Sequence, residues 1–238
     1  MDEEEEGERG TMGMILSLQK AELAKYVQSQ LDSLFPDGSK VDSLGIYLND
    51  TLDRLETCFT AIADTHFWRG GETFFNHLHS DQYAMFLYLL SNTIYRRTDW
   101  RSLCDKLFFL NKALYGIDAF YEVELPGIFL FSHTGGTVLG RAQYSDYFLV
   151  YQQCTVGSAR AAEKAGRGVF PVLGQHVSLY AGAAVLGACH IGDNCKISVQ
   201  SVIINKRLKP NTIYRGTPQS FETTTFPFPD NVWKQGKN

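Results

Sequence analysis

Several features that would assign a chain to a large class of proteins are missing from these 238 residues. No uninterrupted apolar run reaches the roughly 18 residues that a membrane-spanning helix needs, so no membrane span is expected. The formal net charge is only -4 at pH 7, so the chain lacks the basic excess that favours nucleic-acid binding. No basic start followed by an apolar centre opens the sequence, as it would in a secretory signal. These absences exclude a membrane span and give no reason to expect a nucleic-acid partner.

Paired cysteine motifs are absent as well. The five cysteines are odd in number and show no C-x-x-C spacing, which favours a reducing compartment over a secreted, disulfide-linked fold. A cytoplasmic location is therefore expected. Residues 1–14 contain four consecutive glutamates and little apolar surface to bury. We expect this leader to be disordered, or foreign to the native sequence, and to lie outside the folded domains.

Apolar residues at helical spacing dominate the stretch from residue 15 to residue 115. They recur every three or four positions in four stripes, with turn signals at 36–38 and 69–71. This spacing predicts a helical domain over residues 15–115. The stripes are Leu23, Val27, Leu31 and Leu34; Leu48, Leu52, Leu55, Phe59 and Ile62; Phe86, Leu87, Leu90 and Ile94; and Leu103, Leu107, Leu110 and Leu114.

A period of six replaces the helical period in the second half of the chain. Neither a helix (period 3.6) nor a strand (period 2) generates it, whereas a coil with three short flat faces does. The pattern predicts an α+β protein in which the helical domain precedes a parallel β-helix over residues 116–218, with an extended tail over 219–238. The aliphatic positions are Leu173, Leu179, Val185, Ile191, Ile197 and Ile203, and the small residues four places after them are Val177, Ala183, Cys189, Cys195 and Ser201.

One histidine interrupts the aliphatic rule. His133 stands six residues before Leu139, in frame with the repeat, and two of the three residues after it are the glycines at 135 and 136. Such small residues let a ligand or another chain approach closely. An imidazole can act as a general base toward a hydroxyl near neutral pH. Asp118 lies fifteen residues earlier, close to one coil of about eighteen residues, so its carboxylate can sit one layer away and orient the imidazole. The alternative is a structural histidine that is buried and hydrogen-bonded to the backbone.

From Tyr115 to Pro218 the sequence resembles the catalytic half of the serine acetyltransferases, hexapeptide-repeat enzymes that transfer an acetyl group from acetyl-CoA to a hydroxyl. The resemblance implies a left-handed β-helix, a helical domain in front of it and an Asp–His catalytic pair, which falls here on Asp118 and His133. The matching motifs are Ile117-Asp118, S-H-T-G-G-T-V-L-G over 132–140, Cys154-Thr155-Val156-Gly157, Pro210-Asn211-Thr212 and Gly216-Thr217-Pro218.

Two departures from the family pattern concern the acceptor. The family carries an Arg-His-Pro that helps to hold the amino acid, and this chain, aligned on Pro171, has Val169 and Phe170 instead. The acid that precedes the catalytic histidine in the family is Ser132 here. Burying the unpaired charges of a zwitterion is costly, so the sequence favours a sugar or saccharide hydroxyl as acceptor, with L-serine as the alternative. Candidate acceptor-binding residues are Asp81, Ser132, Phe170, and Arg160 and Arg167 from a loop that interrupts the repeat.

The donor implied by the resemblance is acetyl-CoA, a co-substrate and not a tightly bound cofactor. Its phosphates require cations, which the last coil supplies, and its pantetheine arm requires a smooth flank of small residues. No acyl-enzyme cysteine is required, because a deprotonated hydroxyl can attack the thioester directly. No metal is expected, because no Cys, Asp or His at ligand spacing completes a site with His77 and His79. A coil filled with side chains has no internal pocket, so clefts are expected between the subunits of a homotrimer or of a hexamer built from two trimers. The candidate donor-binding residues are Ala181, Gly182, Ala183, Lys206, Arg207 and Lys209.

Other functions stay open. A non-catalytic β-helix scaffold would keep the coil without turnover, although it would have no chemical reason to keep both Asp118 and His133. A metal-dependent hydratase would need several histidines at a subunit interface. His176 and His190 are fourteen residues apart, which does not match one coil. Cys154 as a nucleophile is a further alternative, although no histidine stands beside it in the sequence.

Overall fold

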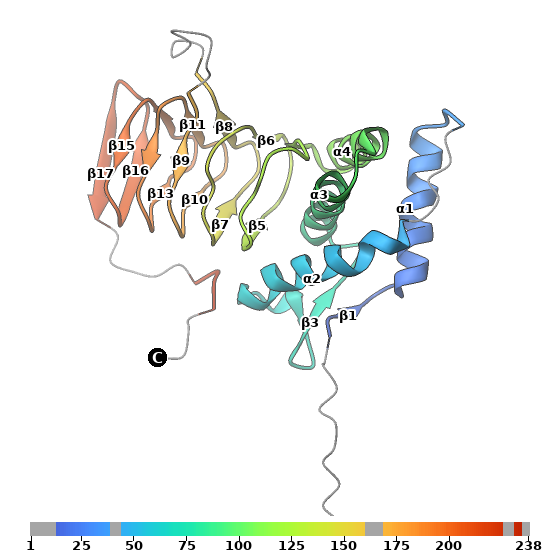
Figure 1. Ribbon diagram of the computed structural model, residues 1–238. Coiled ribbons are helices and arrows are strands. Elements are labelled where there is room, and N and C mark those ends of the chain that lie inside the picture. Colours follow the sequence, from blue (N-terminus) through green and yellow to red (C-terminus); the bar gives the residue numbers. More distant parts are fainter. Residues whose placement is uncertain (1–12, 39–43, 160–168, 226–230, 235–238) are drawn as a thin grey trace, which may run out of the picture.

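The computed structural model describes residues 13–38, 44–159, 169–225 and 231–234. The leader expected over residues 1–14 lies outside these residues, except for its last two. Within the described ranges, no helix is both long enough and apolar enough to cross a membrane. The chain folds into a helical part followed by a coil of short strands, as the two sequence periods predict (Figure 1).

Four helices make up most of the first part, and each coincides with one of the apolar stripes. The third is central: every side chain from Asp81 to Ile94 is buried, because the second and fourth helices pack on it and its remaining side meets the coil. In two stripes the last residue is not buried, because Leu34 and Leu114 are 46% and 45% exposed. The helices are α1 (Lys20–Leu34), α2 (Gly45–Ala61), α3 (Ser80–Arg97) and α4 (Arg101–Tyr115).

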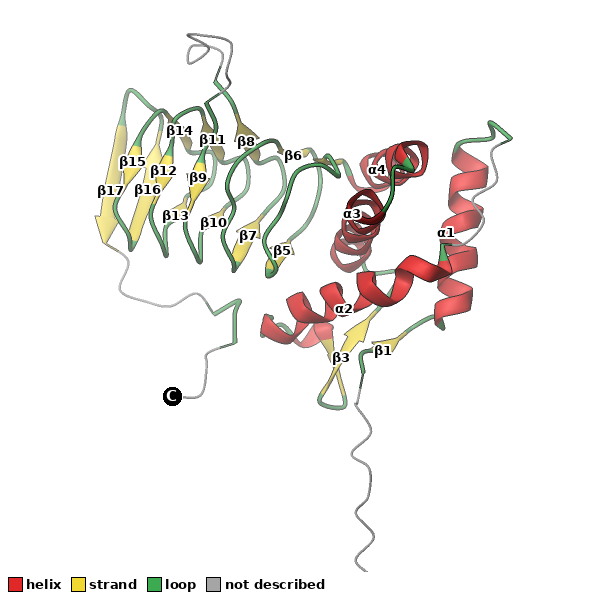
Figure 2. Cartoon of the chain, viewed as in Figure 1, coloured by secondary structure: helices red, strands yellow, loops and turns green. Residues whose placement is uncertain are grey.

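The helical part also contains a small sheet that the sequence pattern does not predict (Figure 2). Strands β1 (Ile15–Leu16), β2 (Trp68–Arg69) and β3 (Glu72–Phe75) pair in the order β1-β3-β2. A short 3₁₀ helix, η1 (Thr65–Phe67), leads from α2 into β2. These strands have two to four residues each, too few for an alternating pattern to be recognised.

The second part is a parallel coil with three faces. The first face holds β5, β7, β10, β13 and β16, the second holds β4, β6, β8, β11 and β14, and the third holds β9, β12 and β15. The strands are β4 (Ile117–Ala119), β5 (Phe129–Phe131), β6 (Thr137–Leu139), β7 (Phe148–Val150), β8 (Thr155–Gly157), β9 (Val172–Leu173), β10 (Ser178–Leu179), β11 (Ala184–Leu186), β12 (His190–Ile191), β13 (Lys196–Ile197), β14 (Val202–Ile204), β15 (Arg207–Leu208), β16 (Thr212–Gly216) and β17 (Phe221–Thr225).

The residues that recur with the period of six fill the interior of the coil. All six aliphatic residues of the repeat are at most 2% exposed, and the five small residues between them are at most 1% exposed. Cys189 and Cys195 are therefore core residues, as the pattern predicts. Gly192 marks a corner where coils approach closely: a Cβ there would lie 2.6 Å from the backbone nitrogen of Pro210. A larger residue would force adjacent coils apart.

The C-terminal stretch, expected as an extended tail over 219–238, joins the fold in two places. Strand β17 pairs antiparallel with β16 at the end of the first face. Residues 231–234, called here the C-terminal segment, lie beside the end of α2 (Figure 1). There Trp233 forms an antiparallel β-bridge with Ile62 and is only 3% exposed. The chain thus returns from the far end of the coil to the helical part.

Candidate active site

The turn that carries His133 is longer than the turns stacked on it. Phe131 pairs with Val150 and Val138 pairs with Thr155, so seven residue steps (131 to 138) lie opposite five (150 to 155). The two additional residues project from the corner between the first and second faces. His133 is exposed and has a φ of 52°, in the left-handed region that non-glycine residues rarely occupy. The repeat is thus interrupted at the residue that the sequence marks as a candidate base.

A carboxylate from the helical part holds this turn in place. Asp81, in the first turn of α3, is only 8% exposed. Its Oδ2 accepts a hydrogen bond from the backbone N–H of His133 at 3.0 Å, and its Oδ1 accepts one from that of Thr134 at 3.3 Å. Hydrogen bonds to an ionised acceptor are stronger than neutral ones. Asp81 therefore acts on the candidate site through the backbone, and its predicted contact with an acceptor stays a prediction.

An open pocket of about 400 Å³ lies beside His133. Its lining includes both polar and apolar residues, and four separate stretches of the chain contribute to it. The pocket is lined by Leu130, Ser132 and His133 at the end of β5, Leu149 and Tyr151 from the next coil, Ala63 and Asp64 after α2, and Asn231 and Val232 from the C-terminal segment.

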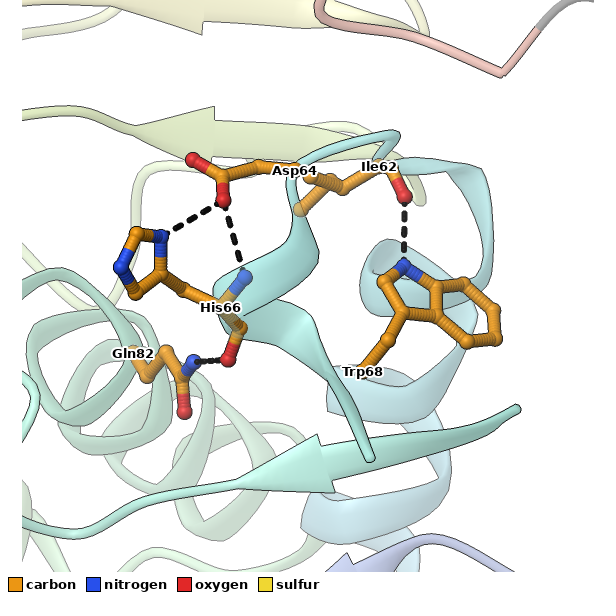
Figure 3. A network of polar contacts seen from close by, with 5 residues as sticks. All are labelled: Ile62, Asp64, His66, Trp68 and Gln82. Carbon is orange, nitrogen blue, oxygen red and sulfur yellow. Dashed lines mark hydrogen bonds and ion pairs between the residues drawn. The ribbon is translucent and has the colours of Figure 1, made fainter. Parts of the chain in front are cut away.

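Asp64 supplies a carboxylate to this pocket. Its Oδ1 accepts hydrogen bonds from the backbone N–H of His66 at 2.9 Å and pairs with the His66 Nδ1 at 2.8 Å (Figure 3). The backbone oxygen of His66 accepts a bond from the Gln82 side chain at 3.0 Å, which ties this loop to α3. Burial alone would raise the pKa of Asp64, but the hydrogen bonds from His66 outweigh it and lower the pKa. Its Oδ2 accepts no hydrogen bond from any residue in the described ranges, so this oxygen is available to a ligand.

Asp118 lies on β4, where its register partner is Val138. Its carboxylate pairs with the Lys112 Nζ at 2.6 Å. Within the part of the chain that the structure describes, no hydrogen bond joins Asp118 to His133. The role of Asp118 in orienting the imidazole therefore stays a prediction.

The other candidate acceptor-binding residues do not all line this pocket. Ser132 lines the pocket next to His133, whereas Phe170 is half-buried and is not among the pocket residues. Arg160 and Arg167 lie outside the described residues. The structure therefore brings Ser132 and His133 together with Asp64, a residue that the sequence reasoning missed. Asp64 follows an apolar stripe as an ordinary loop acid would, so no periodic signal distinguishes it.

The candidate donor-binding residues occupy two separate parts of one chain. Gly182, with a φ of 72°, stands at the same corner of the coil as His133, whereas Ala183 is fully buried and is a core residue. Arg207 and Lys209 line a second open pocket, of about 550 Å³, on the third face. Lys206 lies over the ring of Phe221, with 4.2 Å between its Nζ and the ring centroid. A single chain does not bring the small-residue flank and the basic residues together.

The residues considered for other chemistries are placed differently. Cys154 is buried, and its Sγ donates to the backbone oxygen of Tyr180 at 3.1 Å. Burial raises the pKa of its thiol to about 11, so it is not a reactive nucleophile. His176 stacks on Tyr147 with 4.1 Å between ring centroids, and His190 is exposed on the third face. Among described residues, no three His, Cys, Asp or Glu side chains form a group that could hold a metal ion.

Comparison with known proteins agrees with the motifs. No family model matches the sequence. A serine acetyltransferase of Synechococcus elongatus is 36% identical over 97 residues, which make up 40% of this chain and 38% of that protein. The alignment thus spans well under half of the length of this relative.

Solved structures share the arrangement of both parts of the chain. Serine acetyltransferase from Neisseria gonorrhoeae matches with a TM-score of 0.64 at 18% identity, over 87% of this chain and 79% of that one. A serine acetyltransferase in complex with CoA matches with a TM-score of 0.61 at 18% identity, over 82% of this chain and 81% of that one. At such identities the likeness shows the fold alone. It confirms a helical part followed by a left-handed β-helix, and, with the sequence relative, it confirms the resemblance to serine acetyltransferases.

Proposed function

We propose that this protein is a CoA-dependent serine O-acetyltransferase in which His133 is the general base. The observation that carries the proposal is the geometry of the His133 turn: an exposed imidazole, on a turn whose backbone is held by a buried carboxylate, lies beside a pocket with a second carboxylate. The fold is that of serine acetyltransferases, and the aligned relative is one of them.

The chemistry requires one base and two well-placed substrates. His133 accepts the proton of the acceptor hydroxyl as its oxygen attacks the thioester carbonyl of acetyl-CoA. The tetrahedral intermediate then expels the CoA thiolate, which takes up the proton from the imidazolium. The products are the O-acetyl ester and free CoA. In this proposal Asp118 orients the imidazole, exchanging its present partner Lys112 for His133 when the substrates bind.

The acceptor is proposed to be L-serine. The sequence favours a sugar, because Val169, Phe170 and Ser132 replace polar residues of the family pattern. The comparisons support L-serine better, since both the sequence relative and the matching structures are serine acetyltransferases. The pocket adds a physical reason. The open Oδ2 of Asp64 can accept a hydrogen bond from the ammonium group of serine, and so take the place of the family's acid, which is Ser132 in this chain.

The donor is proposed to be acetyl-CoA, bound between subunits. The small-residue corner at Gly182 and the basic residues Arg207 and Lys209 lie apart in one chain. In this proposal a trimer about the coil axis places one subunit's corner beside a neighbour's third face and so builds a single trench for acetyl-CoA. A trimer, or a hexamer of two trimers, is therefore part of the proposal, and light scattering of the purified protein tests it.

Release of free CoA thiol from acetyl-CoA tests the proposed reaction. L-serine and a panel of sugars and nucleotide sugars serve as acceptors. We expect turnover with L-serine, and a loss of about two to four orders of magnitude in the His133→Ala variant while CoA binding survives. His77→Ala is the matched control, because His77 bonds to Ser17 in the small sheet, away from the pocket.

The outcomes separate the parts of the proposal. Turnover with sugars alone would mean that the acceptor is wrong and the reaction class is right. Undiminished turnover in His133→Ala would rule out this residue as the base. Bound CoA without turnover on any acceptor would favour the non-catalytic scaffold.

A further inference from the structure

The C-terminal segment is fixed to the helical part by backbone pairing. The N–H of Ala63 donates to the backbone oxygen of Val232 at 2.8 Å, and the N–H of Lys234 donates to that of Ala61 at 2.8 Å. These two bonds flank the bridge between Ile62 and Trp233. The segment is thus held in register against the end of α2, directly before the pocket residue Asp64.

Side chains anchor the segment on both sides. Trp233 is 3% exposed and meets the ring of Tyr147 edge-to-face, with 5.5 Å between ring centroids. The Nζ of Lys234 lies 3.2 Å from the ring centroid of Trp68, and the Trp68 indole in turn donates to the backbone oxygen of Ile62 at 2.8 Å (Figure 3). A large buried aromatic and a cation–π contact both oppose detachment.

The fixed segment also lines the pocket beside His133. Asn231 and Val232 line this pocket together with Leu149. Leu149 is the middle residue of β7, between the core residues Phe148 and Val150, so its side chain points out of the coil. It is nevertheless only 1% exposed, because other parts of the chain cover the outer side of the coil at this position.

We propose that the C-terminal segment is a wall of the acceptor pocket that limits the size of the acceptor. The inference rests on the proposed function and deepens it. The polar residues of the pocket, Asp64 and His133, bind the charged and reacting groups of the acceptor. The wall at Val232 faces its carbon skeleton and favours serine over longer hydroxy amino acids.

Two substitutions at Val232 test the wall in opposite directions. Val232→Phe fills the pocket, and we expect the KM for L-serine to rise about tenfold or more, with kcat and the KM for acetyl-CoA nearly unchanged. Val232→Ala enlarges it, and we expect the ratio of kcat/KM for L-homoserine to that for L-serine to rise about tenfold, the range that one methylene in an apolar pocket discriminates. Ile46→Phe is the matched control, because Ile46 is 63% exposed at the other end of α2.

Two substitutions at Trp233 test whether the choice of acceptor depends on anchoring the C-terminal segment. Trp233→Ala releases the anchor and should shift the homoserine-to-serine ratio in the same direction as Val232→Ala. Trp233→Phe should behave as wild type, because the indole Nε1 has no hydrogen-bond partner among the described residues and the ring contact survives. A purely structural tail would lower thermal stability in Trp233→Ala and leave the ratio unchanged.

Different results would refute the wall and the proposed function. Wild-type turnover with L-serine, combined with an unchanged KM in Val232→Phe and an unchanged ratio in Trp233→Ala, would overturn the wall alone. Turnover with a sugar only would overturn the proposed acceptor, and the same ratio measured on a smaller and a larger sugar would then decide on the wall. A wild-type protein inactive on every acceptor would overturn both.

Discussion

Replacing Asp81 by asparagine should damage catalysis through the backbone of the His133 turn, apart from any loss of the predicted contact with the acceptor. Its two oxygens accept the backbone N–H groups of His133 and Thr134 at 3.0 and 3.3 Å. They thereby hold His133 at a φ of 52°, a conformation that costs a non-glycine residue about 1–2 kcal/mol. The asparagine keeps one acceptor oxygen and turns an NH₂ donor toward the other N–H group.

The size of the effect follows from the bond that is lost. A hydrogen bond to a charged group contributes about 1.5–3 kcal/mol, so the turn loses about 2 kcal/mol of support. At about 1.4 kcal/mol per factor of ten, the catalytic conformation of His133 becomes about 30-fold less populated. We expect kcat to fall by this factor in Asp81→Asn, and by about 1,000-fold in Asp81→Ala, where both bonds are lost and the support falls by about 4 kcal/mol.

The assay is thiol release at saturating L-serine and acetyl-CoA. Asp99→Asn is the matched control, because Asp99 is an exposed acid close to the start of another helix, α4, and is not among the pocket residues. Thermal melts of the variants separate a local effect from unfolding. A kcat for Asp81→Asn within twofold of wild type, in a folded protein, would refute the view that this carboxylate positions the base.

Three further variants test other parts of the structure. Asp64→Asn should raise the KM for L-serine about tenfold through the lost charged hydrogen bond, and Asp53→Asn, on the exposed side of α2, should not. The pKa of Asp64 is lowered from its ordinary value of 3.8, so the carboxylate stays ionised above that pH. The difference in serine binding should therefore persist down to about pH 4 and vanish only as the pH falls further. Cys154→Ala should retain activity within about threefold, and a loss of about 1,000-fold would instead indicate an acyl-enzyme. Iodoacetamide at pH 8 should leave Cys154 of the folded protein unmodified, because burial raises the pKa of its thiol to about 11. Gly192→Ala should lower the free energy of unfolding by about 1–3 kcal/mol in urea titrations, since its Cβ would lie 2.6 Å from backbone of the next coil, whereas Gly157→Ala, with no atom within 4 Å, should cost far less.

The repeat made the coil predictable because its signal is local. Each coil places residues six apart in equivalent inward positions, so Leu173 to Ile203 could be assigned to the core from spacing alone, and all are buried. The helices followed from their own period in the same way. Leu34 and Leu114 belong to apolar stripes but are exposed. A stripe shows which face of a helix packs against its neighbours, but it does not show how far those neighbours extend along the helix.

The pocket was only partly predictable because it joins distant segments. Asp81 and His133 are 52 residues apart, and their contact is made through the backbone, which leaves no trace in side-chain spacing. Asp64 and Val232 meet at the pocket because of the bridge between Ile62 and Trp233. A bridge of single residues has no periodicity, so neither residue could be assigned to the site from the sequence.

The helical part therefore contributes residues to the pocket beside His133 and is more than a support for the coil. Asp81 from α3 sets the conformation of His133, and Asp64 after α2 supplies the open carboxylate beside it. The coil alone would present His133 on a longer, unsupported turn, with no acid in the pocket. This arrangement also accounts for the departures from the family pattern. An ammonium group needs an anionic partner at the right place, and it does not matter which segment provides it. With Asp64 in the pocket, the replacement of the family's acid by Ser132 does not exclude an amino-acid acceptor.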